Sequence, residues 1–162
     1  MIDSAVTALA FAVAIASALV AGIFYAFSSF VMPALGRIDA RSGVDAMNAI
    51  NVTVITPSFL ALFVGAALAC AALGLWSLFW WSEPGAGAIL AASLFYLFGC
   101  FGVTMVCNVP LNDRLAALKA DDGDAFWRLY LRVWTRWNTV RTVAPAVSAM
   151  LFVWALVQRH AV

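Results

Sequence analysis

The chain has 162 residues, of which 65% are hydrophobic, and only nine Lys or Arg and eight Asp or Glu residues carry a formal charge. A soluble globular domain is usually about 45–50% apolar and about 25% charged. Because so few charges cannot cover a surface that faces water, the composition excludes a soluble monomer, a disordered chain and a nucleic-acid-binding protein. We therefore expect residues 1–162 to form a single integral-membrane domain.

Four long uncharged stretches predict four transmembrane helices. Since about 20 apolar residues span the hydrocarbon core of a bilayer, we place these helices at about 4–36, 50–82, 85–110 and 138–158. The runs are too long and too continuous for barrel strands, which alternate over about 10 residues. The polar segment at about 123–137 predicts an amphipathic interfacial helix. The expected fold is an all-α membrane protein, a four-helix transmembrane bundle with this interfacial helix between the third and fourth spans.

The basic residues indicate how the bundle is oriented. Only Arg159 follows the fourth span, while eight basic residues follow the first span or lie between the third and the fourth: Arg37, Arg41, Arg114, Lys119, Arg128, Arg132, Arg136 and Arg141. The positive-inside rule places both of these connections in the cytoplasm. We therefore expect a multi-pass protein of the inner or plasma membrane, with both termini and the turn at Glu83 on the non-cytoplasmic side.

Four prolines fall at a similar depth near the cytoplasmic boundary: Pro33, Pro57, Pro110 and Pro145. Interrupted helices are tolerated in a membrane where protein or water satisfies the freed carbonyls, so this level suits a pocket. The alternative interpretation is that each proline simply marks a helix end.

Several polar side chains lie at this same level. Asn108 and Asn112 are four residues apart and share a helix face, next to Asp113. A buried amide needs partners, because an unpaired one is costly in the membrane. Asn51 precedes Pro57 and either adds a polar group to the same level or serves as an ordinary helix cap. The cluster is a candidate site at the cytoplasmic end of the bundle.

A second group of side chains forms one face of the helix that leads into the fourth span. Within an arc of about 100° lie Trp127, Tyr130, Trp134, Trp137, Asn138 and Arg141. The arginines on the opposite face are suited to anionic lipid headgroups, and the tryptophans to an aromatic belt. Arg141 either snorkels to the interface, or faces the bundle interior, paired to Asp113 or to carbonyls, and binds an anion or polarised oxygen.

The residue types that are missing narrow the chemistry. The sequence has one histidine, His160, beside the C-terminus, and no carboxylate within the four predicted spans. Haem, di-iron and zinc sites built on histidine need more histidine ligands than this chain offers. Cys100 and Cys107 share a face of the third span, where buried thiols that pack are the simpler interpretation than a soft-metal site. We therefore predict no metal and no cofactor.

Four segments together resemble a known family. They are FSSFVMPAL at 27–35, AMNAIN at 46–51, NVPLNDRL at 108–115 and WTRWNTVRT at 134–142. In these the chain resembles the anthrone oxygenase-like family of small four-helix membrane proteins, most of them of unknown function. A histidine often follows the Trp-Asn pair in that family, and Thr139 stands at that place here. The resemblance implies an oxidoreductase that converts a polyphenolic anthrone to an anthraquinone with dioxygen, without a recognised metal or flavin.

The resemblance also suggests roles for individual residues. An aromatic slot formed by Tyr130, Trp134 and Trp137, with Asn51 beside it, would bind the substrate. Donors to the anion would be Asn108, Asn112, Asn138 and Arg141, with Asp113 as the nearby candidate base. The expected partners are a hydrophobic aromatic small molecule and membrane lipids, and self-association into a homo-oligomer is left open. The alternative is a non-catalytic membrane protein whose Asn/Trp/Arg cluster binds lipid or a partner and locks the helices together.

Overall fold

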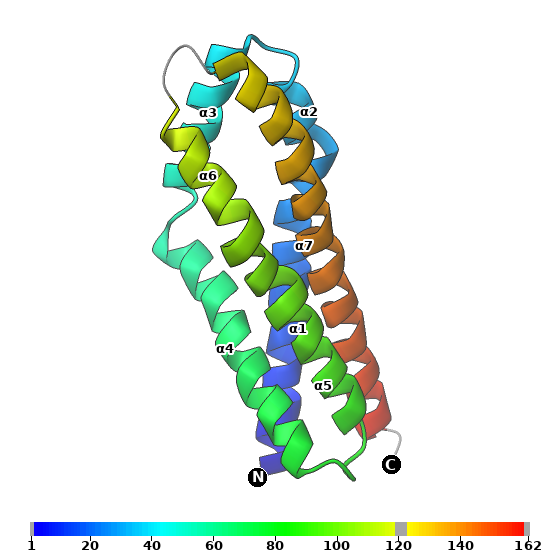
Figure 1. The fold of residues 1–162 in the computed structure, drawn as a ribbon. Coiled ribbons are helices and arrows are strands. Elements are labelled where there is room, and N and C mark those ends of the chain that lie inside the picture. The colour runs from blue at the N-terminus through cyan, green and yellow to red at the C-terminus, as the bar shows by residue number, and fades with distance from the viewer. Residues whose placement is uncertain (1, 119–122, 161–162) are drawn as a thin grey trace.

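A computed structural model describes residues 2–118 and 123–160, and helices account for nearly all of them (Figure 1). Lys119, one of the basic residues used to orient the chain, lies outside the described residues. The elements are α1 (Ile2–Ala26), the π-helical η1 (Phe27–Val31), α2 (Met32–Leu35), α3 (Ala40–Thr53), α4 (Pro57–Phe79), α5 (Ala86–Leu94), the π-helical η2 (Phe95–Gly102) and η3 (Thr104–Asn108), α6 (Val109–Ala116) and α7 (Gly123–His160).

Four helices are long and apolar enough to cross a bilayer, which supports the prediction of a multi-pass membrane protein: Ser4–Leu35, Pro57–Phe79, Ala86–Ala116 and Asp124–His160. At a rise of 1.5 Å per residue, the 23 residues of α4 cover about 35 Å, close to the thickness of a hydrocarbon core. The other three helices are longer and continue beyond α4 at one end of the bundle (Figure 1).

The second span begins later than the sequence suggested. Residues 50–53 belong to α3, and α4 starts at Pro57. Proline lacks a backbone N–H and disfavours the helical conformation for the residue before it. Thr56 accordingly has an extended backbone and accepts a hydrogen bond from the Phe59 N–H, which caps α4. Because the chain breaks here, α3 forms a separate helix that we did not predict.

The structure does not show a distinct interfacial helix at 123–137, because these residues are the first part of the continuous helix α7. The chain has no proline or glycine between Gly123 and Pro145 that would end the helix. Its aromatic face also packs against protein, because Trp127, Tyr130 and Trp134 are buried in a core cluster with Met47 of α3. Arg128, Arg132 and Arg136 are exposed on the opposite face, as the helical spacing predicted.

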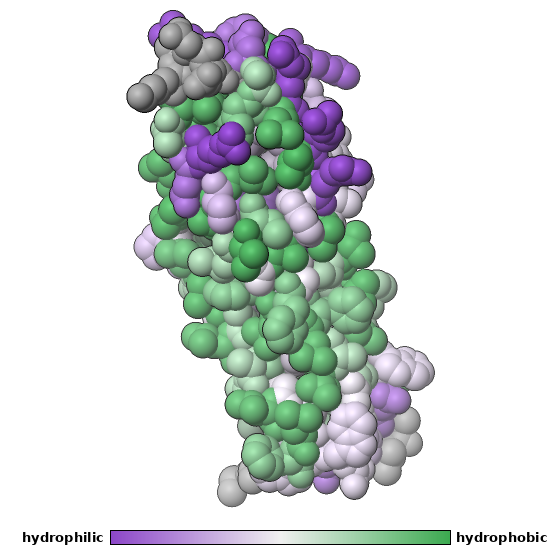
Figure 2. Space-filling view, viewed as in Figure 1, coloured by the Kyte–Doolittle hydropathy of each residue, from purple (hydrophilic) through white to green (hydrophobic). Residues whose placement is uncertain are grey.

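Polar side chains gather at one end of the bundle. Both described termini lie at the end where α4 turns into α5, while α2, α3 and the start of α7 lie at the other end (Figure 1). Figure 2 shows hydrophilic residues concentrated at this second end and an apolar surface along the spans. We call this end, formed by residues 36–56, 113–118 and 124–136, the charged end.

Candidate functional site

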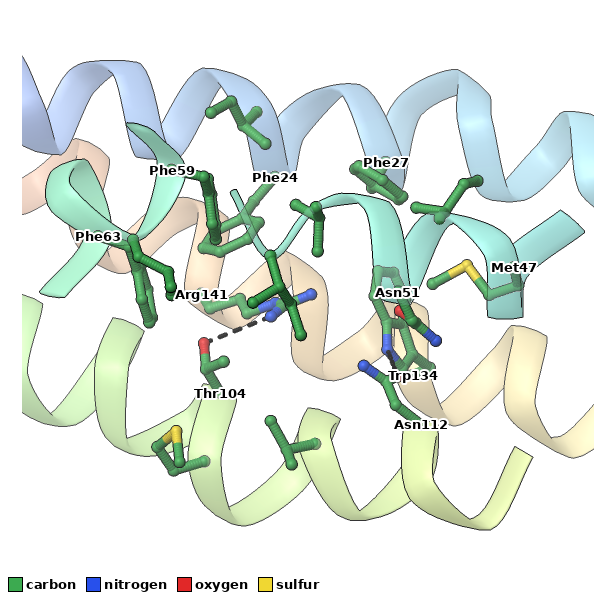
Figure 3. Close-up of a pocket in the computed structure, with 17 residues that line it drawn as sticks. Phe24, Phe27, Met47, Asn51, Phe59, Phe63, Thr104, Asn112, Trp134 and Arg141 are labelled. Atoms are coloured by element: carbon green, nitrogen blue, oxygen red, sulfur yellow. Dashed lines mark hydrogen bonds between the residues drawn. The ribbon is translucent and has the colours of Figure 1, made fainter. Parts of the chain in front are cut away.

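A cavity of about 300 Å³ lies inside the bundle next to the charged end (Figure 3). Eight aliphatic or thioether side chains line it, together with five aromatic rings from three of the spans: Phe24, Phe27, Phe59, Phe63 and Trp134. Its polar lining residues are Asn51, Thr104, Asn112 and Arg141. No aspartate, glutamate or histidine is among the described residues that line it. The cavity is therefore an aromatic pocket with a few amide, hydroxyl and guanidinium groups.

The segment between α3 and α4 forms part of the wall of this cavity. Residues 54–56 leave the helical path, and Val54 and Ile55 from this segment line the cavity together with Ile50 and Met47 of α3. If α4 continued as a straight helix before Pro57, its side chains would follow the axis of the bundle. Because the chain breaks there, α3 instead covers one end of the cavity. Of the four prolines noted in the sequence, Pro57 lies next to this segment, because it is the first residue of α4.

Arg141 is the most unusual residue of the cavity. Its side chain is only 6% exposed. The Nε group donates to Asn138 Oδ1 at 3.0 Å, and NH1 donates to Thr104 Oγ1 at 3.4 Å. The guanidinium carbon lies 4.1 Å from the ring centre of Phe24 and 4.9 Å from that of Trp134.

None of the groups that contact Arg141 carries a negative charge. Within the described part of the chain no carboxylate forms an ion pair with it, and Asp113, the partner considered from the sequence, is exposed. Burial of an ion in a low-dielectric interior costs several kcal/mol even after relaxation. The two ring contacts, worth about 0.5–2 kcal/mol each, offset only part of that cost. The guanidinium of Arg141 is therefore buried without a counter-ion among the described residues.

Asn138 holds Arg141 in place and links the first and last spans. Its Nδ2 group donates to the Phe24 carbonyl and to Ser28 Oγ, each at 2.7 Å, so that Oδ1 is left to accept from Arg141. Phe24 lies just before η1, where a π-helical turn loosens the backbone ladder. Asn138 is fully buried and does not line the cavity. It therefore lies behind the guanidinium of Arg141 and outside the cavity wall.

Asn112 is oriented by two donors from α7. Its Oδ1 accepts from Tyr130 Oη and from Trp134 Nε1, both at 2.8 Å. Tyr130 and Trp134 are buried, and their rings stack 5.9 Å apart. Asn108, one turn earlier, is fully buried, and its Nδ2 donates to the Trp134 carbonyl at 3.2 Å. These bonds fix the third span to α7 beside the cavity.

The structure divides the predicted site residues into three groups. Those that line the cavity are Asn51, Asn112, Trp134 and Arg141. Those that support it from behind are Asn108, Tyr130 and Asn138. The remaining two, Asp113 and Trp137, are exposed and do not line the cavity. The geometry therefore does not support Asp113 as the base or Trp137 as part of the aromatic slot.

Sequence reasoning missed Thr104 and the phenylalanines as lining residues. Thr104 Oγ1 donates to the Cys100 carbonyl at 2.8 Å and accepts from Arg141, so it joins α7 to the third span. Its spacing of four residues before Asn108 and eight before Asn112 is the signal that would have found it. Nothing in the sequence distinguishes Phe24, Phe27, Phe59 and Phe63 from other phenylalanines of the spans.

Comparison with known proteins identifies the family. The sequence profile described as anthrone oxygenase matches residues 51–151, well over half of the chain. The chain belongs to the anthrone oxygenase family. No curated protein and no solved structure matches it. The matched region holds every polar residue that lines the cavity, whereas Phe24 and Phe27 of the first span lie outside it.

Thr139, the position at which the resemblance implied a histidine, does not line the cavity. It is exposed, its hydroxyl donates to the Thr135 carbonyl at 2.9 Å, and it lies 3.2 Å from Ser28 Oγ. A side chain at this position contacts the first span on the outer side of Asn138. In this member of the family the polar groups that face the cavity come from other positions.

Proposed function

We propose that this protein is a membrane-embedded oxygenase that oxidises a hydrophobic, polyphenolic anthrone-type substrate with dioxygen in the cavity next to the charged end. The observation that carries the proposal is Arg141, a buried guanidinium without a counter-ion in the wall of an aromatic cavity. Family membership supports the same reaction class. A flat phenolic ring system matches the aromatic wall, and its anion would supply the charge that Arg141 lacks.

The chemistry that this cavity suits begins with loss of a proton from the methylene carbon of the anthrone. The resulting anion is delocalised onto the substrate oxygen, where Arg141 would stabilise it. The anionic carbon then forms a bond to dioxygen and gives a peroxide. Loss of the second hydrogen of that carbon as a proton, with cleavage of the O–O bond, gives the carbonyl and water. In sum, a CH₂ group and O₂ become a C=O group and H₂O.

The lining residues suggest how the proton is lost. Since no carboxylate or imidazole is among the described residues of the wall, the protein would act by lowering the pKa of the bound substrate and not by supplying a base. Each 1.36 kcal/mol of preferential stabilisation of the anion lowers that pKa by one unit. The proton would leave to water at the charged end, and Asn138 and Thr104 would keep Arg141 directed at the developing negative charge.

The proposal is tested with Arg141→Met and the matched control Arg136→Met, which removes an exposed arginine of the same helix. Protein in lipid nanodiscs is assayed for dioxygen uptake with a polyphenolic anthrone, and the rate without protein is subtracted. Loss of one preorganised donor to a developing anion typically lowers kcat about 10²–10³-fold. We expect a loss of this size in Arg141→Met, none in Arg136→Met, and a shift of the remaining activity to higher pH. Wild-type turnover by Arg141→Met would refute the proposal.

The non-catalytic alternative is favoured by one observation, the bonds by which Asn138 joins α1 to α7. If the cluster served only to lock the helices, Arg141→Met would lower the thermal midpoint of unfolding. In the proposed function the variant keeps or raises that midpoint, because removal of an unpaired buried charge relieves its desolvation cost. The two readouts, turnover and midpoint, therefore separate an enzyme from a structural lock.

For the surroundings of the site, we propose that the charged end faces the cytoplasm and that both termini lie on the other side. The concentration of basic residues at this end supports the orientation. Arg128, Arg132 and Arg136 are exposed there and suit the phosphates of anionic lipids. Accessibility of single cysteines, introduced at Ser42 and at Glu83, to a membrane-impermeant thiol reagent tests the orientation. Labelling of Ser42→Cys from outside intact cells would reverse it.

A further inference from the structure

The cavity holds two polar anchors whose hydrogen-bonding character is fixed by the surrounding structure. Figure 3 shows Arg141 with Thr104 in one part of the cavity, and Asn112 with Asn51 and Trp134 further along it. Arg141 can only donate, because a guanidinium has no acceptor. What Asn112 can do depends on which way its amide is turned, since the oxygen and nitrogen of an amide have similar size and opposite roles.

The chemistry of its partners sets the orientation of Asn112. The indole Nε1–H of Trp134 is a donor and never an acceptor, and it lies 2.8 Å from Asn112 Oδ1. The Tyr130 hydroxyl, also at 2.8 Å, donates to the same oxygen. If the amide were reversed, its NH₂ group would face the Trp134 N–H and leave that buried donor unsatisfied. The oxygen of Asn112 is therefore directed at α7.

The NH₂ group of Asn112 is then left for the cavity. Asn112 is half-buried and lines the cavity, and its Nδ2 has no hydrogen-bond partner among the described residues. Asn51 also lines the cavity, and its buried Nδ2 atom has no hydrogen-bond partner among the described residues. The fixed polar group at this end is thus a neutral donor, whereas the one at Arg141 is a charged donor.

From this pattern we propose that Asn112 is a specificity-determining residue, which selects ligands that carry a second acceptor oxygen, a ring carbonyl or a phenol, in addition to the anionic oxygen bound by Arg141. This inference rests on the proposed function, because it assigns the second contact of the same aromatic ligand. A carbonyl accepts from the Asn112 NH₂ group, whereas a ligand with only carbon at this place leaves a donor of the cavity without a partner. The substrate class is thereby narrowed to ring systems with acceptor oxygens at two separated positions.

Asn112→Asp tests the assignment, because it replaces the donor by an acceptor and keeps the rest of the site. The carboxylate still accepts from Tyr130 and Trp134, so the hydrogen bonds between the third span and α7 remain. Two probes on one tricyclic frame are compared by equilibrium binding in nanodiscs. Hydroxyanthraquinone has an acidic phenol and ring carbonyls, and hydroxyanthracene has a phenol and no carbonyl.

The measured quantity is the ratio of the two dissociation constants, hydroxyanthracene to hydroxyanthraquinone. Both dissociation constants are measured at a pH at which the phenols of both probes are ionised. A negative charge at position 112 then weakens the binding of both phenolates similarly, and the ratio reports the contact with the carbonyl. We expect Asn112→Asp to lower this ratio at least about tenfold relative to wild type, since the hydrogen bond to the carbonyl is replaced by repulsion between two acceptors. An unchanged ratio overturns the role of Asn112 and leaves the proposed function standing.

Two further results keep the test decisive. If wild-type protein binds neither probe, the proposed substrate class fails together with this inference. The carbonyl stretching frequency of hydroxyanthraquinone bound to the wild-type protein gives a readout that needs no variant. We expect a shift to lower frequency relative to the probe in an apolar solvent, because the carbonyl accepts a hydrogen bond. A carbonyl frequency equal to that in the apolar solvent overturns the inference even where Asn112→Asp does not fold.

Discussion

Replacement of Asn112 by leucine is the sharpest test of how this site is held together. Leucine has a similar size but no acceptor, so the variant removes the oxygen that accepts from both Tyr130 and Trp134. Tyr130 is fully buried and Trp134 is 2% exposed, so water has little access to the two donors left behind. Asn112→Leu should therefore destabilise the protein, although a leucine is better suited than an amide to an apolar interior.

The size of the effect follows from the two hydrogen bonds. A buried donor that loses its partner costs about 1–3 kcal/mol, so two such donors cost about 2–6 kcal/mol in the free energy of unfolding. For a chain of this length, 1 kcal/mol moves the midpoint of thermal unfolding by about 2–4 °C. We expect the midpoint of Asn112→Leu to fall by roughly 4–24 °C, and that of Asn112→Asp to stay near the wild-type value because its acceptor oxygens remain.

The assay is thermal unfolding in one detergent, followed by size-exclusion recovery of folded protein. A double-mutant cycle with Tyr130→Phe strengthens it, because the phenylalanine removes one of the two donors beforehand. Asn112→Leu should then cost about half as much in the Tyr130→Phe background. If Asn112→Leu melts like wild type, the two bonds contribute nothing to stability, and the argument that they orient the Asn112 amide fails as well.

Two further changes test how α3 is placed over the cavity. A Cβ atom at Gly43 would lie 2.6 Å from Cζ2 of the buried Trp127 ring, so Gly43→Ala should cost about 1–3 kcal/mol in the free energy of unfolding. The control Gly22→Ala, with no neighbouring atom within 4 Å, should leave the thermal midpoint unchanged or raise it. Equal thermal midpoints for the two variants would contradict the contact between Gly43 and Trp127. The Asp39 carboxylate accepts from the Ser42 N–H at the start of α3, and this bond holds its pKa below the ordinary value. Since the folded pKa is lowered, the stabilisation of α3 is present at neutral pH and is lost as the pH falls through and below the usual aspartate range near about 3.9. Hydrogen-exchange protection of the first turn of α3 should fall over that pH range in the wild-type protein. In Asp39→Ala the protection should be low at every pH. Protection that still depends on pH in this variant would contradict the role of the carboxylate.

Much of the fold follows from composition and spacing. Long uncharged runs can only be helices in a bilayer, because every backbone group must be satisfied within the chain. The four spans were therefore predictable, and the gathering of basic residues showed which end carries the polar groups. The helical spacing of Trp127, Trp134 and Arg141 placed these side chains on one face of α7, and in the structure all three are buried. Trp137, at the edge of the same arc, is exposed, since an arc of about 100° is wider than the contact that α7 makes there.

The sequence by itself determined that this protein is a membrane bundle with polar side chains at one level, because hydrophobic length and charge placement are local properties that the chain order displays. Only the tertiary structure decided which of those side chains face a cavity. Asn112 and Asp113 are neighbours in the chain, yet one lines the cavity and the other is exposed. Arg141 had two interpretations from the sequence. The approach of Phe24 from the first span and Thr104 from the third is what encloses it without a counter-ion among the described residues. Contacts between distant segments leave no signature in the sequence of any one segment.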